Sequence, residues 1–159
     1  PSTLSTSTTT TTIISDTTSS TTTTNPSGCP LEQALGSEHL LELGLFRKFR
    51  DERLAASPLG ARLVSMYYAR SGELTEILAK HPELLQEARK LTFAIIPYLH
   101  SDIVVNNKIM LGKIERKQIV SLGMAIHNYA STSLQKDIQF VLDSLNSYEM
   151  LQEIGIRIY

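Results

Sequence analysis

Residues 57–72 read SPLGARLVSMYYARSG, and this stretch decides the fold class. Ser57 followed by Pro58 indicates a helix start, because a Ser hydroxyl caps free N–H groups of the first turn and Pro fits the first helical position. Apolar side chains then recur at three- and four-residue steps, at Leu59, Leu63, Met66 and Tyr67. We expect this helix to end near Ser71-Gly72, where two turn-forming residues meet.

The same spacing of apolar residues extends in both directions from this helix. The sequence predicts further helices at residues 37–54, 73–80, 82–97, 114–129 and 134–154. Ser37 is the expected N-cap of the first of these, and Pro97 is the expected end of the third. We therefore expect a mainly α fold, a bundle of about five to six helices joined by short loops and preceded by an extended Thr/Ser-rich segment.

Two short segments of the C-terminal half depart from the helical pattern. Residues 101–112 fit either a short strand at Ile103-Val104-Val105 or a helix capped by Ser101. Gly155 is the expected C-cap of the last helix. Apolar and polar residues alternate over 156–158, which predicts a terminal strand that includes Tyr159.

The first 28 residues differ in composition from the rest of the chain. Residues 1–24 contain 13 Thr and 6 Ser. Such a tract buries too little apolar surface to offset its ordering entropy, which favours a flexible spacer whose hydroxyls are candidate O-glycosylation sites. The alternative is an arm that pairs with a neighbour, because β-branched Thr favours extended backbone. The residues expected to make such contacts are Thr8, Thr9, Thr10, Thr11, Thr12, Ile13 and Ile14.

We divide the chain accordingly. Residues 1–28 form the tail or arm, and Asn25-Pro26-Ser27-Gly28 is the turn cluster that separates it from the body. Residues 29–100 form a helical domain. Residues 101–159 form a C-terminal helical extension that we expect to pack on the same core.

Composition and motifs exclude several classes of function. The formal net charge is −1, so we expect no nucleic-acid partner. The apolar runs are far shorter than the ~20 residues that a bilayer-spanning helix needs. No phosphate-binding loop, dinucleotide fingerprint, nucleophile elbow or His-Glu-x-x-His motif occurs, and the four histidines lack zinc-ligand spacing. We expect no catalytic residue, no cofactor and no metal, and hence no enzyme.

Two candidate contact sites remain. Cys29 is the only cysteine, so it is a candidate for modification or for a disulfide with a second copy; the alternative is a part-buried thiol behind a turn. The second site is a charged contact cluster formed by Arg47, Arg50, Asp51 and Arg53. Arg47 and Asp51 are four residues apart, so they can pair on one helix face. Such a cluster either binds a carboxylate or phosphate or holds its own helix and the loop around Ser57-Pro58 in place.

A series of short matches runs from Cys29 to about Leu99. The matching pieces are Cys29 with Gly36-Ser37, FRKFRDERL at 46–54, SPLG at 57–60, Tyr67-Tyr68, and HPEL at 81–84. In order and spacing they resemble a small bacterial C-terminal domain named the CFI box after its opening sequence Cys-Phe-Ile-Ala-Thr-Ala-Ala-Tyr-Gly-Ser. Here the box reads Pro-Leu-Glu-Gln-Ala-Leu between Cys29 and Gly36, and the chain continues for some sixty residues past the usual end.

The resemblance implies a setting but no chemistry. Domains of this family follow low-complexity linkers at the ends of longer, often exported bacterial proteins, which implies an extracellular or cell-surface location. It implies no catalytic residues. We therefore expect a non-enzymatic structural module that self-associates as a homo-oligomer or homopolymer, such as a filament, with the arm contacting neighbouring subunits. The alternative is a terminal adaptor that binds a secretion or surface-anchoring partner, with the tail as a spacer.

Overall fold

Helices make up most of the structure, which is a computed structural model and describes residues 28–105 and 109–158. In these ranges the elements run in the order α1 (Pro30–Leu35), α2 (Leu40–Phe49), the π-helical turn η1 (Arg50–Leu54), α3 (Pro58–Lys80), α4 (Pro82–Val105), β1 (Ile109–Leu111), α5 (Lys113–His127), α6 (Thr132–Asn146), α7 (Tyr148–Glu153) and β2 (Ile156–Ile158). The mainly α bundle predicted from the sequence is confirmed. The arm residues from Thr8 to Ile14 and the turn at 25–27 lie outside the described residues.

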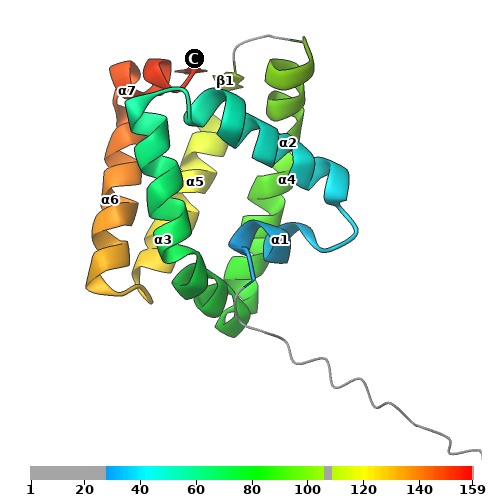
Figure 1. The fold of residues 1–159 in the computed structure, drawn as a ribbon. Coiled ribbons are helices and arrows are strands. Elements are labelled where there is room, and N and C mark those ends of the chain that lie inside the picture. The colour runs from blue at the N-terminus through cyan, green and yellow to red at the C-terminus, as the bar shows by residue number, and fades with distance from the viewer. Residues whose placement is uncertain (1–27, 106–108, 159) are drawn as a thin grey trace, which may run out of the picture.

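The long helices form the body of the bundle (Figure 1). The helix α4 packs against α1, α2 and α5, and α5 packs in turn against α6. The helix α3 contacts α1 and α4 as well as α6 and α7. None of the helices in the described ranges is both long and apolar enough to cross a lipid bilayer.

Two buried clusters form the core, and each joins the two halves of the chain. The first contains Ala34, Ile77, Leu78, Leu84, Ala88, Ile126 and Leu134. The second contains Leu59, Leu111, Leu142, Leu145, Leu151 and Ile154. The expected boundary at residue 100 lies inside α4, which is continuous to Val105. Because both clusters draw side chains from either side of that boundary, the described residues form one folded body.

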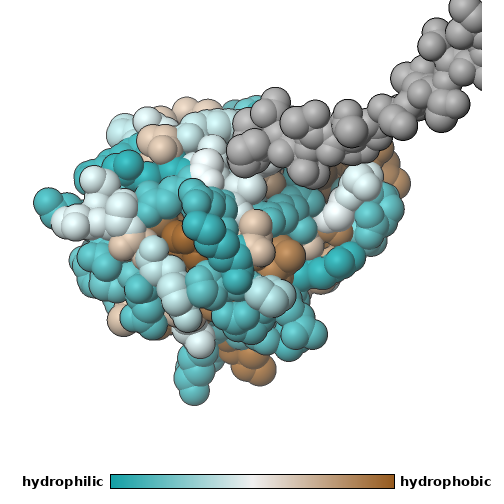
Figure 2. All heavy atoms as spheres, turned by 90° about the horizontal axis from the view of Figure 1, so that it is seen from below, coloured by the Kyte–Doolittle hydropathy of each residue, from teal (hydrophilic) through white to brown (hydrophobic). Residues whose placement is uncertain are grey.

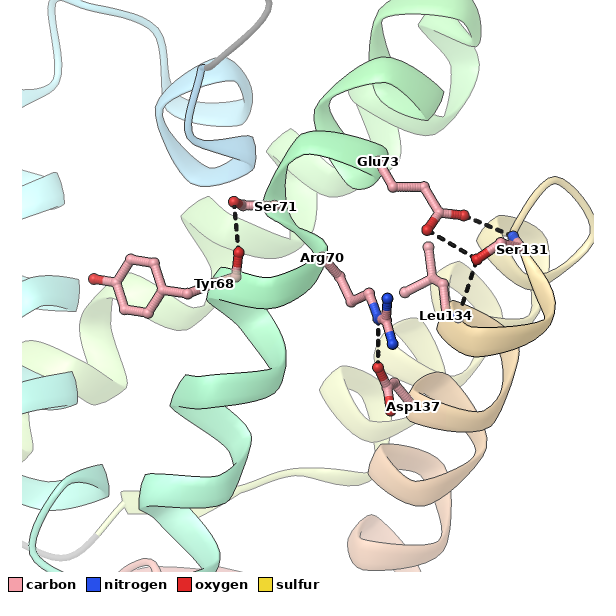
Figure 3. A network of polar contacts seen from close by, with 7 residues as sticks. All are labelled: Tyr68, Arg70, Ser71, Glu73, Ser131, Leu134 and Asp137. Carbon is pink, nitrogen blue, oxygen red and sulfur yellow. Dashed lines mark hydrogen bonds and ion pairs between the residues drawn. The ribbon is translucent and has the colours of Figure 1, made fainter.

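The expected end of a helix at Ser71-Gly72 is wrong, because α3 continues to Lys80. Ser71 Oγ donates a hydrogen bond to the Tyr68 carbonyl at 3.1 Å, and the ribbon of α3 changes direction beside Ser71 (Figure 3). Such hydrogen bonds and Gly/Ser pairs bend helices without ending them. The turn-forming pair therefore marks a bend, and burial of Ile77 and Leu78 beyond it holds the last turns in place.

The expected end at Pro97 is also wrong, because α4 passes through this residue. A proline inside a helix removes one backbone hydrogen bond and costs about 3 kcal/mol. Leu99 beyond it is only 2% exposed, and Asp102 forms an ion pair with Arg53 of η1 at 2.9 Å. These tertiary contacts offset the local cost. They also settle residues 101–105 as the end of α4, while the strand in this region is the later β1.

Two further helix boundaries differ from expectation. Ser37 does not cap a helix; α2 begins after His39, whose side chain makes no capping hydrogen bond. The last predicted helix is interrupted at Ser147, whose Oγ accepts a hydrogen bond from the Met150 N–H and so starts α7. Ser57 caps α3 as predicted, accepting from the Gly60 N–H. Of the two caps predicted at Ser37 and Ser57, the second is thus confirmed and the first is wrong.

The two short strands form a parallel pair near the C-terminus. Ile109 pairs with Ile156, Met110 with Arg157, and Leu111 with Ile158. Gly155 has φ of 78°, which lets the chain leave α7 and enter β2. The predicted terminal strand is confirmed over 156–158, and Tyr159 lies outside the described residues.

Candidate functional site: the root of the N-terminal arm

Residues 28–31, which we call the arm root, are fastened to α3 by side chains. Thr75 Oγ donates a hydrogen bond to the Gly28 carbonyl at 2.6 Å. The Leu31 N–H donates to the Tyr67 hydroxyl at 3.4 Å, and Cys29 Sγ lies 2.9 Å from the same oxygen. Tyr67 and Thr75 are eight residues apart, so they present both contacts from one side of α3. Gly28, the first described residue, is therefore held at a fixed place on the body.

The short helix α1 anchors the arm root to the core. Pro30 occupies its first turn, and Leu35 at its end is 0% exposed. Full burial of one Leu side chain contributes about 2 kcal/mol. Ala34 belongs to the first core cluster. The arm root is thus continuous with the hydrophobic core.

The Cys29 thiol faces a neutral phenol. Burial, and then the hydrogen bond with Cys29, raises the pKa of Tyr67 above its ordinary value. The phenol therefore keeps its proton at neutral pH. Within the described residues it is the only hydrogen-bond partner of Sγ. This pair therefore links the arm root to α3.

Tyr68 links the arm root to the charged contact cluster. Its ring meets that of Tyr67 edge to face, with 5.6 Å between centroids, and its side chain is 54% exposed. Its hydroxyl accepts a hydrogen bond from Arg50, which also makes two hydrogen bonds to Asp51 at 2.7 and 2.9 Å. The Arg50 guanidinium lowers the pKa of the Asp51 carboxyl.

The side chains of the four residues in the charged contact cluster do not point into one shared binding site. Arg50 and Asp51 pair with each other. Arg47 pairs with Glu32 of α1 at 2.8 Å, so the pairing with Asp51 that its spacing allows does not form. Arg53 reaches Asp102, whose side chain is 7% exposed. Each guanidinium has a carboxylate of the protein as its partner. The Arg47 pair ties α2 to α1, and the Arg53 pair ties η1 to α4.

The turn η1 and the start of α3 approach each other at their backbones. A Cβ on Gly60 would lie 2.0 Å from the Leu54 carbonyl oxygen. Ser57 Oγ accepts from the Gly60 N–H at 3.0 Å, and Glu153 of α7 accepts from the Leu59 N–H at 2.8 Å. This gives the SPLG segment a structural role: two oxygens satisfy free N–H groups at the helix start, and the glycine admits the π-helical turn.

A second set of polar contacts joins α3 to α6 (Figure 3). Glu73 accepts hydrogen bonds from the N–H and hydroxyl of Ser131 at 2.6 and 3.0 Å, and Ser131 in turn caps α6 at Leu134. Arg70 pairs with Asp137 at 2.7 Å. These contacts fix the start of α6 against α3, away from the arm root.

The described residues contain no group of three His, Cys, Asp or Glu side chains placed to hold a metal ion. His39 lies between Glu38 and Glu42 at 3.7 and 3.6 Å and packs edge to face on Phe93. His81 stacks on Tyr129 with 3.7 Å between ring centroids. Both rings take part in local contacts at helix starts.

Sequence reasoning found some of these residues and missed their partners. Cys29 and the Arg47–Arg53 stretch stood out by type and spacing. Thr75 and Asp102 did not, because a single Thr or Asp within a helical pattern carries no signal for a partner almost fifty residues away. Comparison of the chain with models of protein families, with curated proteins and with solved structures finds no match.

Proposed function

We propose that this chain is a non-enzymatic, self-associating structural module of an exported bacterial protein, related to the CFI-box domains. Its N-terminal arm, residues 1–27, contacts neighbouring subunits, and its helical body supplies the base from which the arm extends. The fixed arm root carries this proposal. A flexible spacer needs no defined exit point, whereas an arm that transmits force or fixes the geometry of an assembly does.

The clamp at the root supports a mechanical role. Thr75 holds Gly28, Tyr67 holds Cys29 and Leu31, and Leu35 is fully buried behind them. A force that pulls on the arm is therefore transmitted to α3 and to the first core cluster, and α1 stays folded. The Cys29 contact also favours a structural thiol over a reactive one.

One face of the body supports a neighbour contact made through the arm. Figure 2 looks at the body from below Figure 1 and shows a mainly hydrophilic face, with apolar atoms confined to small separate areas. Obligate interfaces between folded subunits are more hydrophobic than such a face. The β-branched arm offers another route, because extended segments bind through backbone hydrogen bonds.

Deletion of residues 1–27 tests the proposal. We expect the full chain to form oligomers by light scattering, and the chain that begins at Gly28 to be a monomer with the same helical circular dichroism. A matched control replaces the arm by a Gly/Ser segment of equal length, which keeps the spacer but removes the β-branched side chains. Oligomers that persist in both variants would contradict the arm's role.

A terminal adaptor is the second candidate, and one observation favours it. Leu40 and Leu41 at the start of α2 are 70% and 86% exposed. We propose that these two adjacent side chains bind a secretion or surface-anchoring partner, because contiguous exposed apolar surface marks interaction sites. Replacing both by Gln leaves arm-dependent assembly intact and removes partner binding if this candidate is correct.

A further inference from the structure

A cleft opens on the surface between α4 and α5. Its floor is apolar and consists of Leu84, Leu91, Leu122 and Ala125. Its rim is polar, and Ser121 of α5 is one of the exposed residues there. The cleft has a volume of about 100 Å³. A cavity of roughly 150 Å³ holds one benzene ring, whereas pockets for small-molecule ligands measure roughly 300–1,000 Å³. The cleft therefore has the size of a site for one apolar side chain.

The apolar surface continues from the cleft toward the start of α5. Ile114 precedes Ser121 by seven residues and Ala125 by eleven, so the three share one face of the helix. Ile114 is 70% exposed. Glu115, the only acidic residue of α5, accepts a hydrogen bond from Tyr98 of α4 at 3.0 Å. An exposed apolar side chain and the cleft thus lie on the same side of α5, separated along the helix by roughly 16 Å.

Two exposed cations lie beside this surface. Lys113 and Lys117 flank Ile114 along α5. Within residues 28–105 and 109–158, neither ammonium group forms an ion pair with a carboxylate. Lys90 at the rim of the cleft differs, because it pairs with Glu87 at 2.7 Å. The end of the surface near Ile114 is therefore positively charged, and the charge that complements it is a carboxylate.

We propose that this α4–α5 surface binds an acidic amphipathic helix of a partner protein. The partner inserts one apolar side chain into the cleft, covers Ile114 with another, and places carboxylates beside Lys113 and Lys117. Helices bind in this way through apolar anchors spaced three, four and seven residues apart. A flat lipid surface could contact Ile114 and the lysines but would leave the cleft empty, so the cleft favours a protein partner. The proposal concerns the folded body and is independent of the arm.

Selection from a displayed library of helix-forming peptides on the full chain tests the proposal. Each peptide is about 14 residues long, enough to cover the distance from the cleft to Ile114. Leu is fixed at positions i, i+4, i+7 and i+11, and every other position is varied among Glu, Gln and Lys. We expect the selected peptides to be enriched in Glu and depleted in Lys, because carboxylates meet the two unpaired lysines.

Two pairs of variants locate the binding site. Ser121→Trp places a large ring over the cleft and should weaken the selected peptides at least about tenfold in a fluorescence titration. Its matched control is Ser65→Trp, at an exposed serine within α3 that does not line the cleft. Lys117→Glu should weaken the Glu-rich peptides, whereas Lys136→Glu, at an exposed lysine of α6, should not. Circular dichroism shows that each variant keeps its helices.

Three results would overturn the proposal. The first is a selection that enriches no peptide, or one that enriches Lys over Glu. The second is a set of peptides that bind the Ser121→Trp chain as tightly as the parent. The third is binding of the chain to phosphatidylserine vesicles, lost with Lys117→Glu, without any peptide that depends on the cleft; the lysines would then serve a lipid surface. Since the arm takes no part in this contact, none of these results alters the proposed self-association.

Discussion

Replacing Gly60 by Ala probes the closest backbone contact in the fold. The new Cβ would lie 2.0 Å from the Leu54 carbonyl oxygen and 2.6 Å from the Leu54 Cα and carbonyl carbon. An ordinary contact needs about 3.5 Å, so η1 and α3 would have to separate by about 1.5 Å. All three of these Leu54 atoms belong to the backbone, which cannot turn away as a flexible side chain can.

The stability lost to the steric clash is partly offset by the higher helix propensity of Ala. Overpacking costs typically about 1–3 kcal/mol, and loosening the Ser57 cap on the Gly60 N–H adds about 1 kcal/mol. Ala is the better helix former by about 1 kcal/mol. We expect a net loss of about 2 kcal/mol in the free energy of unfolding. For a domain of this size that corresponds to a fall in Tm of roughly 4–8 °C.

Gly72 supplies the matched control, because it lies in the same helix with nothing within 4 Å of a Cβ. Gly72→Ala should stabilise the protein by about 0.5–1 kcal/mol, since only the helix propensity changes. Thermal and urea unfolding followed by circular dichroism measure both variants. If Gly60→Ala unfolds at the same temperature as the parent, or rises in Tm together with Gly72→Ala, the close approach of η1 to α3 is refuted.

Three further substitutions test other contacts. Asp102→Ala removes the carboxylate partner of Arg53 and should cost about 2 kcal/mol in urea unfolding; an unchanged midpoint would show that the pair is not formed. Glu73→Ala should cost about 1 kcal/mol and speed hydrogen exchange at the Ser131 amide, whereas unaltered exchange there would contradict the cap on α6. The raised pKa of Tyr67 stabilises the folded state below about pH 10, and this contribution is lost as pH rises through the folded pKa. Tyr67→Phe should therefore lower Tm at pH 8 and flatten its decline toward pH 11; a decline as steep as that of the parent speaks against a buried phenol.

Local signals in the sequence identified the helices with clear starts. Ser57-Pro58 and Pro82 mark helix starts by caps and fixed backbone angles, and these hold. Ser71-Gly72 and Pro97 suggested ends, but burial of Leu99 and of residues 77 and 78 outweighs the local preference. The π-helical turn had no signal at all, because it depends on a glycine that follows it and on tertiary contacts of η1.

The candidate site was predictable in its residue types but not in its pairings. Cys29 was singled out as the only thiol, and Arg50 as part of a dense charged stretch. Tyr67 lies 38 residues from Cys29, and Asp102 lies 49 residues from Arg53. Periodicity assigns a residue to a helix face but does not give the distance between two helices. The fold had to be known before the arm root could be recognised as a clamp.

Sedimentation velocity of the full chain over a wide range of concentrations tests arm-mediated assembly most directly. We expect the weight-average sedimentation coefficient to rise with concentration, and the rise to vanish when excess peptide corresponding to residues 1–27 competes for the neighbour's acceptor site. A single species with the mass of one chain at every concentration, unaffected by the peptide, would contradict it.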